Sequence, residues 1–267
     1  MSEAADRLFA AIEAATQIAP LSSHDAAFDV AAAYRVLGEL HGRREAQGWT
    51  RIGRKIGFTN RTIWPRYGVD RPMWSHVWDR TVTFAPAGEA TLSLAGLMQP
   101  RIEPEVAFML RAPLPDGSDV EAVLRAIAWI APAFEIVHTV FRDWKFGAAD
   151  CTAAFGLHGR LAVGPPLPVD DSNRAALAAE LPRFAVALRR GDALVDTGVG
   201  ANVLDSPALA LMHLRDLLSV QPSFPALASG EIVTTGTLTD AWPVAPGEIW
   251  TSDYGSLGLR GLTVRLV

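Results

Sequence analysis

The stretch EPEVAFML occupies residues 103–110 and places two carboxylates at the start of an apolar run. A run of this kind is typical of a β-strand, in which residues two apart point to the same face of the sheet. Glu103 and Glu105 therefore project in one direction, with backbones about 7 Å apart. Two like charges beside an apolar core repel each other unless a cation lies between them. The stretch therefore predicts a cation site.

A third carboxylate belongs to the same prediction. Glu135 lies within the apolar sequence APAFEIV, residues 131–137, and a charged residue in such a run needs a partner. Three carboxylates without clustered cysteine or histidine suit a hard cation, with Mg²⁺ the best fit and Mn²⁺ or Ca²⁺ as alternatives. The competing interpretation places Glu103 and Glu105 on a solvated strand face and pairs Glu135 with an arginine.

Around this stretch, helical and extended patterns alternate irregularly. Helices are expected at residues 4–16, 25–44 and 206–220, and from a capping box at Ser118 and Glu121 whose apolar face reaches Ile127 and Ala128. Strands are expected at residues 54–59, 77–84, 103–110, 133–140, 184–189, 193–197, 231–235, 248–253 and 262–267. Because strands outnumber helices without regular alternation, the pattern predicts an α+β fold. We expect residues 1–50 to form a helical segment packed on one β-rich catalytic domain, residues 51–267.

Composition narrows the class of protein. The chain has 267 residues, 49 % of them hydrophobic, and a net charge of −5 without a basic run. Nucleic acid is therefore not an expected partner. The only cysteine, Cys151, excludes an intramolecular disulfide and fits a reducing cytoplasm. The acidic N-terminus lacks the features of a signal peptide, and no apolar stretch approaches the roughly 18 residues of a membrane span.

Several motifs, taken in order, resemble the 2-keto-4-pentenoate hydratase and 4-oxalocrotonate decarboxylase branch of the fumarylacetoacetate hydrolase superfamily. The resemblance covers residues 29–267. The matching segments are residues 53–59, 68–72, 75–79, 103–105, 135–137, 143–146, 230–239 and 253–258. The third carboxylate is glutamate, whereas the C–C hydrolases of the superfamily more often present aspartate, so Glu135 favours the hydratase and decarboxylase branch.

This resemblance implies a mixed β-roll core with flanking helices, and Mg²⁺ or Mn²⁺ held by Glu103, Glu105 and Glu135. It also implies a homo-oligomer, with association with a paired pathway enzyme as a further expectation. The implied reaction is hydration of a 2-hydroxypenta-2,4-dienoate to a 4-hydroxy-2-keto acid through a metal-stabilised enolate, in aromatic meta-cleavage catabolism. The alternatives are decarboxylation of 4-oxalocrotonate, C–C hydrolysis of an acylpyruvate, and a non-catalytic partner subunit.

Two residues are expected to assist the chemistry. Lys55 is the candidate for proton transfer or for holding substrate oxygens, because desolvation beside Ile56 and Phe58 would lower its pKa. Its alternative interpretation is a surface lysine of a strand. Asp79 is expected to orient Lys55 or a water molecule, and its alternative interpretation is a turn residue that ends a strand.

Donors for the substrate carboxylate are expected in two segments. Gly236, Thr237 and Thr239 offer a backbone N–H and hydroxyls, although a β-turn with ordinary hydroxyl bonds would look the same. The second segment is DCTAAF, residues 150–155, where the family often carries Asp-Asn-x-Ser-Ser. Alanines replace the serines, and Thr152 is the substitute, shifted by one. This departure indicates a different substrate or an altered hydration step. His76, His138 and Cys151 are expected to be structural.

Overall fold

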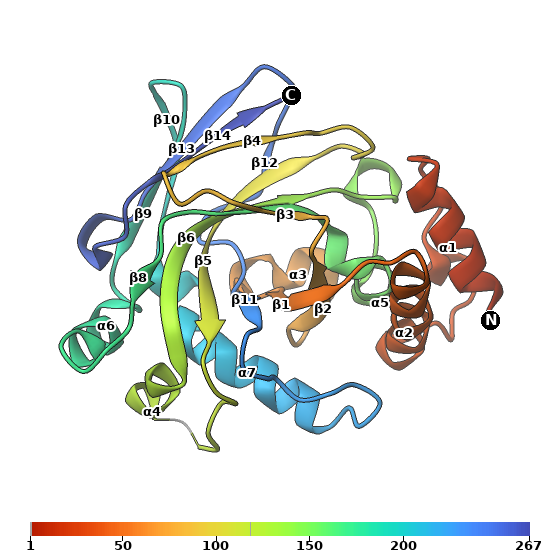
Figure 1. Ribbon diagram of the computed structural model, residues 1–267. Coiled ribbons are helices and arrows are strands. Elements are labelled where there is room, and N and C mark those ends of the chain that lie inside the picture. Colours follow the sequence, from red (N-terminus) through yellow and green to blue (C-terminus); the bar gives the residue numbers. More distant parts are fainter. Residues whose placement is uncertain (1, 118) are drawn as a thin grey trace.

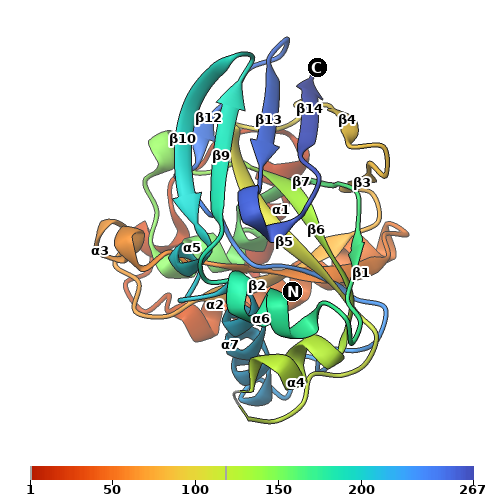
Figure 2. The same cartoon turned by 90° about the vertical axis from the view of Figure 1, so that its left-hand side faces the viewer.

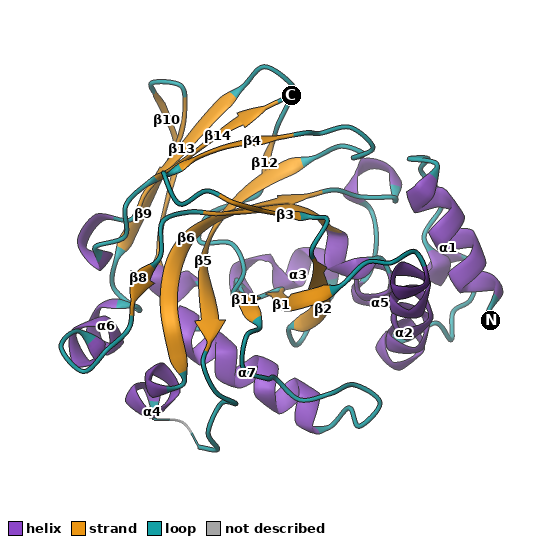
Figure 3. Ribbon diagram, in the orientation of Figure 1, coloured by secondary structure: helices purple, strands orange, loops and turns teal. Residues whose placement is uncertain are grey.

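The computed structural model describes residues 2–117 and 119–267 and confirms the predicted α+β class. Strands fill the centre of the molecule, and helices lie around its edge (Figure 3). The strands are β1 Arg51–Gly57, β2 Met73–Trp78, β3 Val82–Phe84, β4 Glu89–Leu92, β5 Arg101–Leu110, β6 Ile127–Val137, β7 His158–Val163, β8 Leu167–Pro168, β9 Ala185–Arg190, β10 Ala193–Val199, β11 Ile232–Thr234, β12 Trp242–Pro243, β13 Ile249–Asp253 and β14 Leu262–Leu266. The α-helices are α1 Glu3–Glu13, α2 Val30–Ala46, α3 Trp64–Tyr67, α4 Val120–Arg125, α5 Ala148–Ala153, α6 Arg174–Glu180 and α7 Pro207–Ser219.

Two mixed sheets form this centre. The larger has the strand order β2-β1-β11-β5-β6-β7-β3, with β12 beside β5 and β8 beside β6. The smaller has the order β10-β9-β13-β14-β4 and lies at the upper end of the molecule in Figures 1 and 2. Buried side chains join the two sheets, among them Ile102 and Phe134 of the larger and Trp250 and Val264 of the smaller. The predicted β-roll core with flanking helices is therefore present.

The longest strands, β5 and β6, form an antiparallel pair in the middle of the large sheet. Their side chains alternate between the two faces of the sheet. Ile102 and Phe134 face the smaller sheet, whereas Glu103 and Glu135 are cross-strand neighbours on the opposite face. The alternation thus sends apolar residues into the core between the sheets and carboxylates to the opposite face, where Lys55 of β1 reaches Glu135.

The helices cover the large sheet with apolar faces. In α1 and α2, Leu8, Leu37 and Leu40 are fully buried, and the side chains of Ser2 and Asp29 cap the two helices. These two helices lie together beside α5 (Figure 1). Within residues 2–117 and 119–267, every helix falls short of the length and apolar character needed to cross a bilayer.

Several predicted boundaries are wrong. Residues 77–84 form two strands, because the backbone turns at residues 79–81 and β3 pairs with β7 rather than with β1. Ile127 and Ala128 belong to β6, not to a helix, because pairing with β5 overrides the local periodicity. The second helix begins at Val30 instead of residue 25. The capping box at Ser118 lies outside the described residues, and α4 is capped by Asp119.

Candidate active site

The pairing of β5 with β6 brings the three predicted carboxylates together. Glu103 lies directly opposite Glu135, and Glu105 follows two residues later on the same face. One oxygen from each of the three carboxylates lies within 4.8 Å of the others. Sequence positions 32 residues apart thus form one cluster, because a direct cross-strand pair places two side chains about 5 Å apart at Cβ.

This cluster is largely buried and incompletely hydrogen-bonded. Glu105 and Glu135 have no exposed surface, and Glu103 is half-buried. Glu105 Oε2 accepts a hydrogen bond from the Gly236 N–H at 2.9 Å, but Glu105 Oε1 is buried without a partner among the described residues. A buried carboxylate oxygen without a donor costs free energy unless a cation or a proton satisfies it. Three carboxylates that each offer an oxygen, one of them without a hydrogen-bond donor, fit a divalent cation such as Mg²⁺ or Ca²⁺.

The surroundings of the three carboxylates shift their pKa values in different directions. Burial raises the pKa of Glu103 to about 7, and burial together with the charge of Glu135 raises the pKa of Glu105 well above its ordinary value. Burial acts on Glu135 in the same direction, but Lys55 and His158 outweigh it and lower its pKa to about 2. One carboxylate is therefore held ionised, and the other two gain by binding a cation or a proton.

Lys55 reaches the cluster from β1. Its Nζ donates a hydrogen bond to Glu135 Oε2 at 2.6 Å, and the side chain is only 5 % exposed. Burial disfavours the ammonium, but Glu135, Glu103 and Glu105 together outweigh burial and raise the pKa of Lys55. The expectation that desolvation lowers this pKa is therefore wrong for the ion-free protein, because three carboxylates face the amine.

His158, at the start of β7, is a member of the cluster that sequence reasoning missed. Its Nδ1 lies 2.7 Å from Glu135 Oε1, and its Nε2 lies 2.8 Å from Thr81 Oγ1. Because an ionised carboxylate only accepts hydrogen bonds, Nδ1 is the donor in this pair. Glu135 is thus held between two N–H donors. No motif marks His158, and only the register of β6 with β7 brings it to Glu135.

Another unpredicted contact fixes the strands that carry the carboxylates. The buried Tyr254 hydroxyl donates to the backbone carbonyl of Glu105 at 2.7 Å and accepts from the backbone N–H of Ala133 at 3.3 Å. It therefore bridges β5 and β6 beside the cluster. This contact gives the C-terminal segment at residues 253–258 a structural role.

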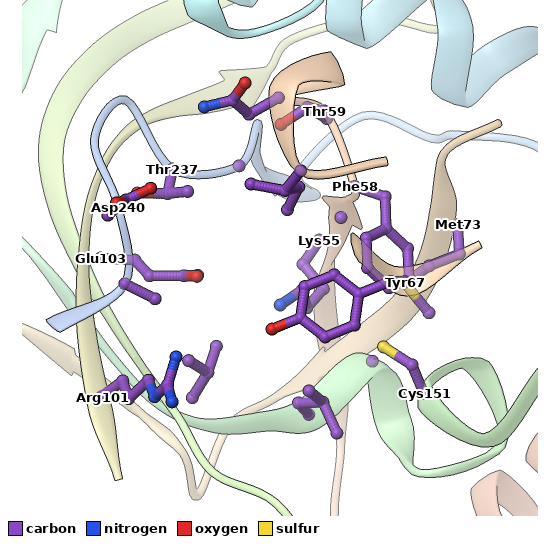
Figure 4. A pocket seen from close by; sticks show the side chains of 18 of the residues that line it. Lys55, Phe58, Thr59, Tyr67, Met73, Arg101, Glu103, Cys151, Thr237 and Asp240 are labelled. Carbon is purple, nitrogen blue, oxygen red and sulfur yellow. The ribbon is translucent and has the colours of Figure 1, made fainter. Parts of the chain in front are cut away.

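A pocket of about 130 Å³ opens onto the cluster. In Figure 4, Glu103, Arg101, Thr237 and Asp240 lie on one side, and Phe58, Tyr67, Met73 and Cys151 lie on the other. Lys55 points between the two groups (Figure 4). The pocket walls come from β1, α3, β5, α5 and the loop after β11, so most of the predicted motifs meet here.

The loop after β11 contributes one wall of this pocket. Gly236 adopts φ +93°, and a Cβ atom at this position would lie 1.9 Å from Thr59 Oγ1. Its N–H is already bound to Glu105. The hydroxyls of Thr237 and Thr239 donate to the carbonyls of Thr239 and Asp240. The loop lines the pocket as expected, but these donors are engaged within the protein.

Two expected site residues lie elsewhere. Asp79 is exposed, and its carboxylate accepts from the backbone N–H groups of Thr50 and Arg80 at 2.9 Å. The expectation that it orients Lys55 is therefore not met, because it ends a strand as a turn residue. Thr152 is buried, and its hydroxyl donates to the carbonyl of Ala148 at 2.8 Å. In α5 it is the neighbouring Cys151 that lines the pocket.

Comparisons with known proteins were made at the level of families, sequences and structures. No protein-family model matches the chain. The chain is 32 % identical over 243 residues to the 2-hydroxyhexa-2,4-dienoate hydratase of Comamonas testosteroni. The match covers 91 % of this chain and 89 % of the relative. It is 33 % identical over 261 residues to 2-keto-4-pentenoate hydratase 1 of Dechloromonas aromatica, with 96 % and 93 % covered.

Among solved structures, the chain resembles the 4-oxalocrotonate decarboxylase from Pseudomonas putida G7, complexed with magnesium and adipate. The TM-score is 0.87 at 25 % identity, and the match covers 98 % of this chain and 95 % of the other. The likeness extends over the two sheets and the N-terminal helices alike, since almost the whole chain is matched.

Proposed function

Because the chain belongs to the 2-keto-4-pentenoate hydratase and 4-oxalocrotonate decarboxylase family of the fumarylacetoacetate hydrolase superfamily, we propose that it is a metal-dependent hydro-lyase. The proposed substrate is a short 2-hydroxy-2,4-dienoic acid from aromatic meta-cleavage catabolism. Hydration adds a proton at C5 and hydroxide at C4 of 2-hydroxypenta-2,4-dienoate. The C2 enol becomes a ketone as C3 takes a proton, which gives a 4-hydroxy-2-keto acid.

The observation that carries this proposal is the buried carboxylate cluster with its unsatisfied oxygen. Glu103, Glu105 and Glu135 would hold the ion, which we propose to be Mg²⁺ or Mn²⁺. Three carboxylates and the Lys55 ammonium leave two negative charges when all are ionised, and one divalent cation balances them. When bound there, the cation supplies a Lewis acid for the oxygens of the keto acid head.

Two side chains, Lys55 and His158, would act beside the cation. Lys55 Nζ projects into the pocket, where it can hold the substrate's oxygens or transfer a proton to the substrate. His158 is a positioning residue, because it fixes the second oxygen of Glu135 without lining the pocket. Phe58, Tyr67 and Met73 line the pocket with apolar surface, and a bound substrate covered by them would be shielded from bulk water, which strengthens charge interactions.

Decarboxylation of 4-oxalocrotonate is the second candidate, favoured by the structural likeness to a decarboxylase. It needs the same electron sink at the keto acid head. C–C hydrolysis is less well supported, because it needs a general base for water. The His158 imidazole pairs with Glu135 but lies outside the lining of the pocket.

We also propose where the enzyme is located in the cell and that it forms a homo-oligomer. The single cysteine, Cys151, is buried and unpaired, which supports a reducing cytoplasm. The family resemblance supports a homo-oligomer, and light scattering coupled to size-exclusion chromatography would measure the number of subunits.

The experiment is a spectrophotometric assay of 2-hydroxypenta-2,4-dienoate and 4-oxalocrotonate, each with Mg²⁺ and with a chelator. Metal-dependent loss of the dienoate absorbance supports the hydratase, and CO₂ release from the second substrate supports the decarboxylase. Loss of neither substrate, in protein that binds Mg²⁺, would contradict both.

A further inference from the structure

A second hollow, of about 190 Å³, lies apart from the active-site pocket. Among the described residues, the two share no lining side chain. The walls of this second hollow come from the ends of α1 and α2, the turn after β2, the loops after β4, β6 and α5, and the start of β7. Its volume is far above what one water molecule needs, so it suits a small organic molecule.

The charged lining of this hollow is mostly cationic. Arg44 and Arg160 line it, and Glu13 is the acid among the lining residues that the structure describes. Glu13 Oε1 accepts a hydrogen bond from Arg44 Nη1 at 2.7 Å, so the charges of these two side chains balance each other. The positive charge of Arg160 therefore remains.

Arg160 is held by backbone carbonyls instead of by an acid. Its Nη1 donates to the carbonyl of Gly159 at 2.8 Å, and its Nη2 donates to the carbonyl of Ala95 at 3.3 Å. Burial lowers the pKa of Arg160, and no carboxylate among the described residues acts against burial. A half-buried guanidinium in these surroundings gains free energy when an anion pairs with it.

His138 adds a hydrogen-bond donor to the same hollow. Its Nδ1 accepts from the Met98 N–H at 3.4 Å, so Nε2 carries the hydrogen of the neutral ring. Burial lowers the pKa of His138 to about 4, and His158, Arg160 and Arg44 act in the same direction. These three neighbours line the hollow with His138, and an anion among them would relieve their mutual repulsion.

The remaining lining is largely apolar. Leu97, Val140 and Phe155 contribute aliphatic and aromatic surface. Trp78 lines the hollow as well and packs edge-on against Trp49, with ring centroids 6.3 Å apart. Trp78 Nε1 is buried without an acceptor among the described residues. A molecule in the hollow thus meets both apolar surface and N–H donors.

We propose that this hollow binds a small organic carboxylate, with its oxygens on Arg160 and on His138 Nε2, and its apolar body against Leu97, Val140 and Phe155. An inorganic anion would leave the apolar surface uncovered. A neutral molecule would leave the charge of Arg160 without a partner.

His158 joins this site to the carboxylate cluster. Its ring lines the hollow, while its Nδ1 holds Glu135 Oε1 at 2.7 Å. Thr81, which lies 2.8 Å from His158 Nε2, lines the hollow too. A carboxylate in the hollow would attract a cation in the cluster across this pair, so each ligand would strengthen the binding of the other. This link rests on the proposed metal site, whereas the carboxylate site itself does not.

Benzoate and benzamide test the carboxylate site, because they share a shape and differ in charge. Calorimetry on metal-free native protein should give benzoate at least about tenfold tighter binding than benzamide. We expect this preference to vanish in Arg160→Gln. The control is Arg111→Gln, because Arg111 also donates to two backbone carbonyls, those of Ala128 and Val169, but lies outside the hollow.

Two results would overturn the carboxylate site. One is equal affinity of native protein for benzoate and benzamide. The other is equal affinity of native protein and Arg160→Gln for benzoate, with the fold of the variant verified by circular dichroism. A crystal structure of native protein with 4-bromobenzoate gives the same decision without a variant. The anomalous signal of bromine should lie in the hollow, and a signal only elsewhere would contradict the assignment.

The dissociation constant of Mg²⁺, measured with and without saturating benzoate, tests the link through His158. We expect benzoate to tighten Mg²⁺ binding about two- to fivefold in native protein and to leave it unchanged in Arg160→Gln. No change in native protein, or the same gain in Arg160→Gln, would overturn the link. Protein that binds benzoate in the hollow but does not bind Mg²⁺ would contradict the proposed function and leave the carboxylate site standing.

Discussion

Glu105 is the residue whose surroundings most directly require a ligand. Its carboxylate has one oxygen bound to the Gly236 N–H and the other buried without a partner among the described residues. The pair formed with Glu103 was predictable from residues 103–110, because a strand places alternate residues on one face. Lys55 and His158 were not predictable as the partners of Glu135, since they join it through strand pairings that no local pattern encodes.

The role of His158 can be tested through metal affinity. His158→Ala removes the N–H donor that holds Glu135 Oε1, so we expect Mg²⁺ to bind about 10- to 100-fold more weakly. Isothermal titration calorimetry gives the dissociation constant, and circular dichroism shows whether the fold is intact. The matched control is His24→Ala at an exposed histidine outside the pocket. Equal Mg²⁺ affinity in His158→Ala and the native protein would rule out the positioning role.

Proton competition at Glu103 gives a second prediction. The pKa of Glu103 is raised by burial to about 7, so the ion must displace a proton from this carboxylate below that pH. We expect Mg²⁺ affinity to fall as pH decreases from 8 to 6, and binding at pH 6 to release protons. Calorimetry in buffers of different ionisation enthalpy measures this release. An affinity independent of pH over this range would contradict the assignment of Glu103 as a ligand.

The antiparallel strands β5 and β6 carry the three carboxylates, and the loop after β11 lines one side of the pocket beside them. The apolar run in β5 was readable from the sequence, but the first two residues of β6, Ile127 and Ala128, were assigned to a helix. Residues 127–128 continue a helical pattern locally, and they become strand only because residues 108–110 offer an edge for pairing. The loop motif was recognised, whereas the engagement of its donors within the protein was not.

The tight contact at Gly236 predicts a large effect of one methyl group. Gly236→Ala combines an unfavourable φ of +93° with a clash at Thr59, and it displaces the N–H that binds Glu105. We expect a loss of more than about 2 kcal/mol of unfolding free energy and weaker Mg²⁺ binding. Gly230→Ala is the control, because Gly230 has a similar φ of +87° but open space around its Cβ position.

Denaturant unfolding measures both glycine variants. Gly230→Ala should show only the backbone penalty of about 1 kcal/mol, with unchanged Mg²⁺ affinity. Equal effects of the two substitutions on stability and on metal binding would mean that the contact with Thr59 does not organise the site.

For the whole molecule, the carboxylate cluster couples stability to pH and to metal. Glu103 binds its proton more tightly in the folded protein, with a pKa of about 7 against 4.5. The ion-free protein therefore loses stability as pH rises from 4.5 to 7. Glu135, with its pKa lowered to about 2, contributes stability above pH 4.5 that is lost as pH falls toward 2.

Metal addition should compensate the loss at high pH. At a Mg²⁺ concentration about 100 times Kd, binding contributes about 2.7 kcal/mol, which corresponds to roughly 5–10 °C in Tm. We expect a rise of this size at pH 8 and a much smaller rise at pH 5, measured by scanning calorimetry. A rise in Tm that is the same at both pH values would contradict the coupling.

As the metal site of a dienoate hydratase, the carboxylate cluster would make turnover depend on both the cation and Glu105. The measurement is the Mg²⁺-dependent rate of 2-hydroxypenta-2,4-dienoate consumption by native protein, Glu105→Gln and the exposed control Glu89→Gln. We predict metal-dependent turnover by native protein and Glu89→Gln, and a loss of at least about 100-fold in Glu105→Gln with the fold intact. Turnover that survives a chelator, or that is unchanged in Glu105→Gln, would contradict this role of the cluster.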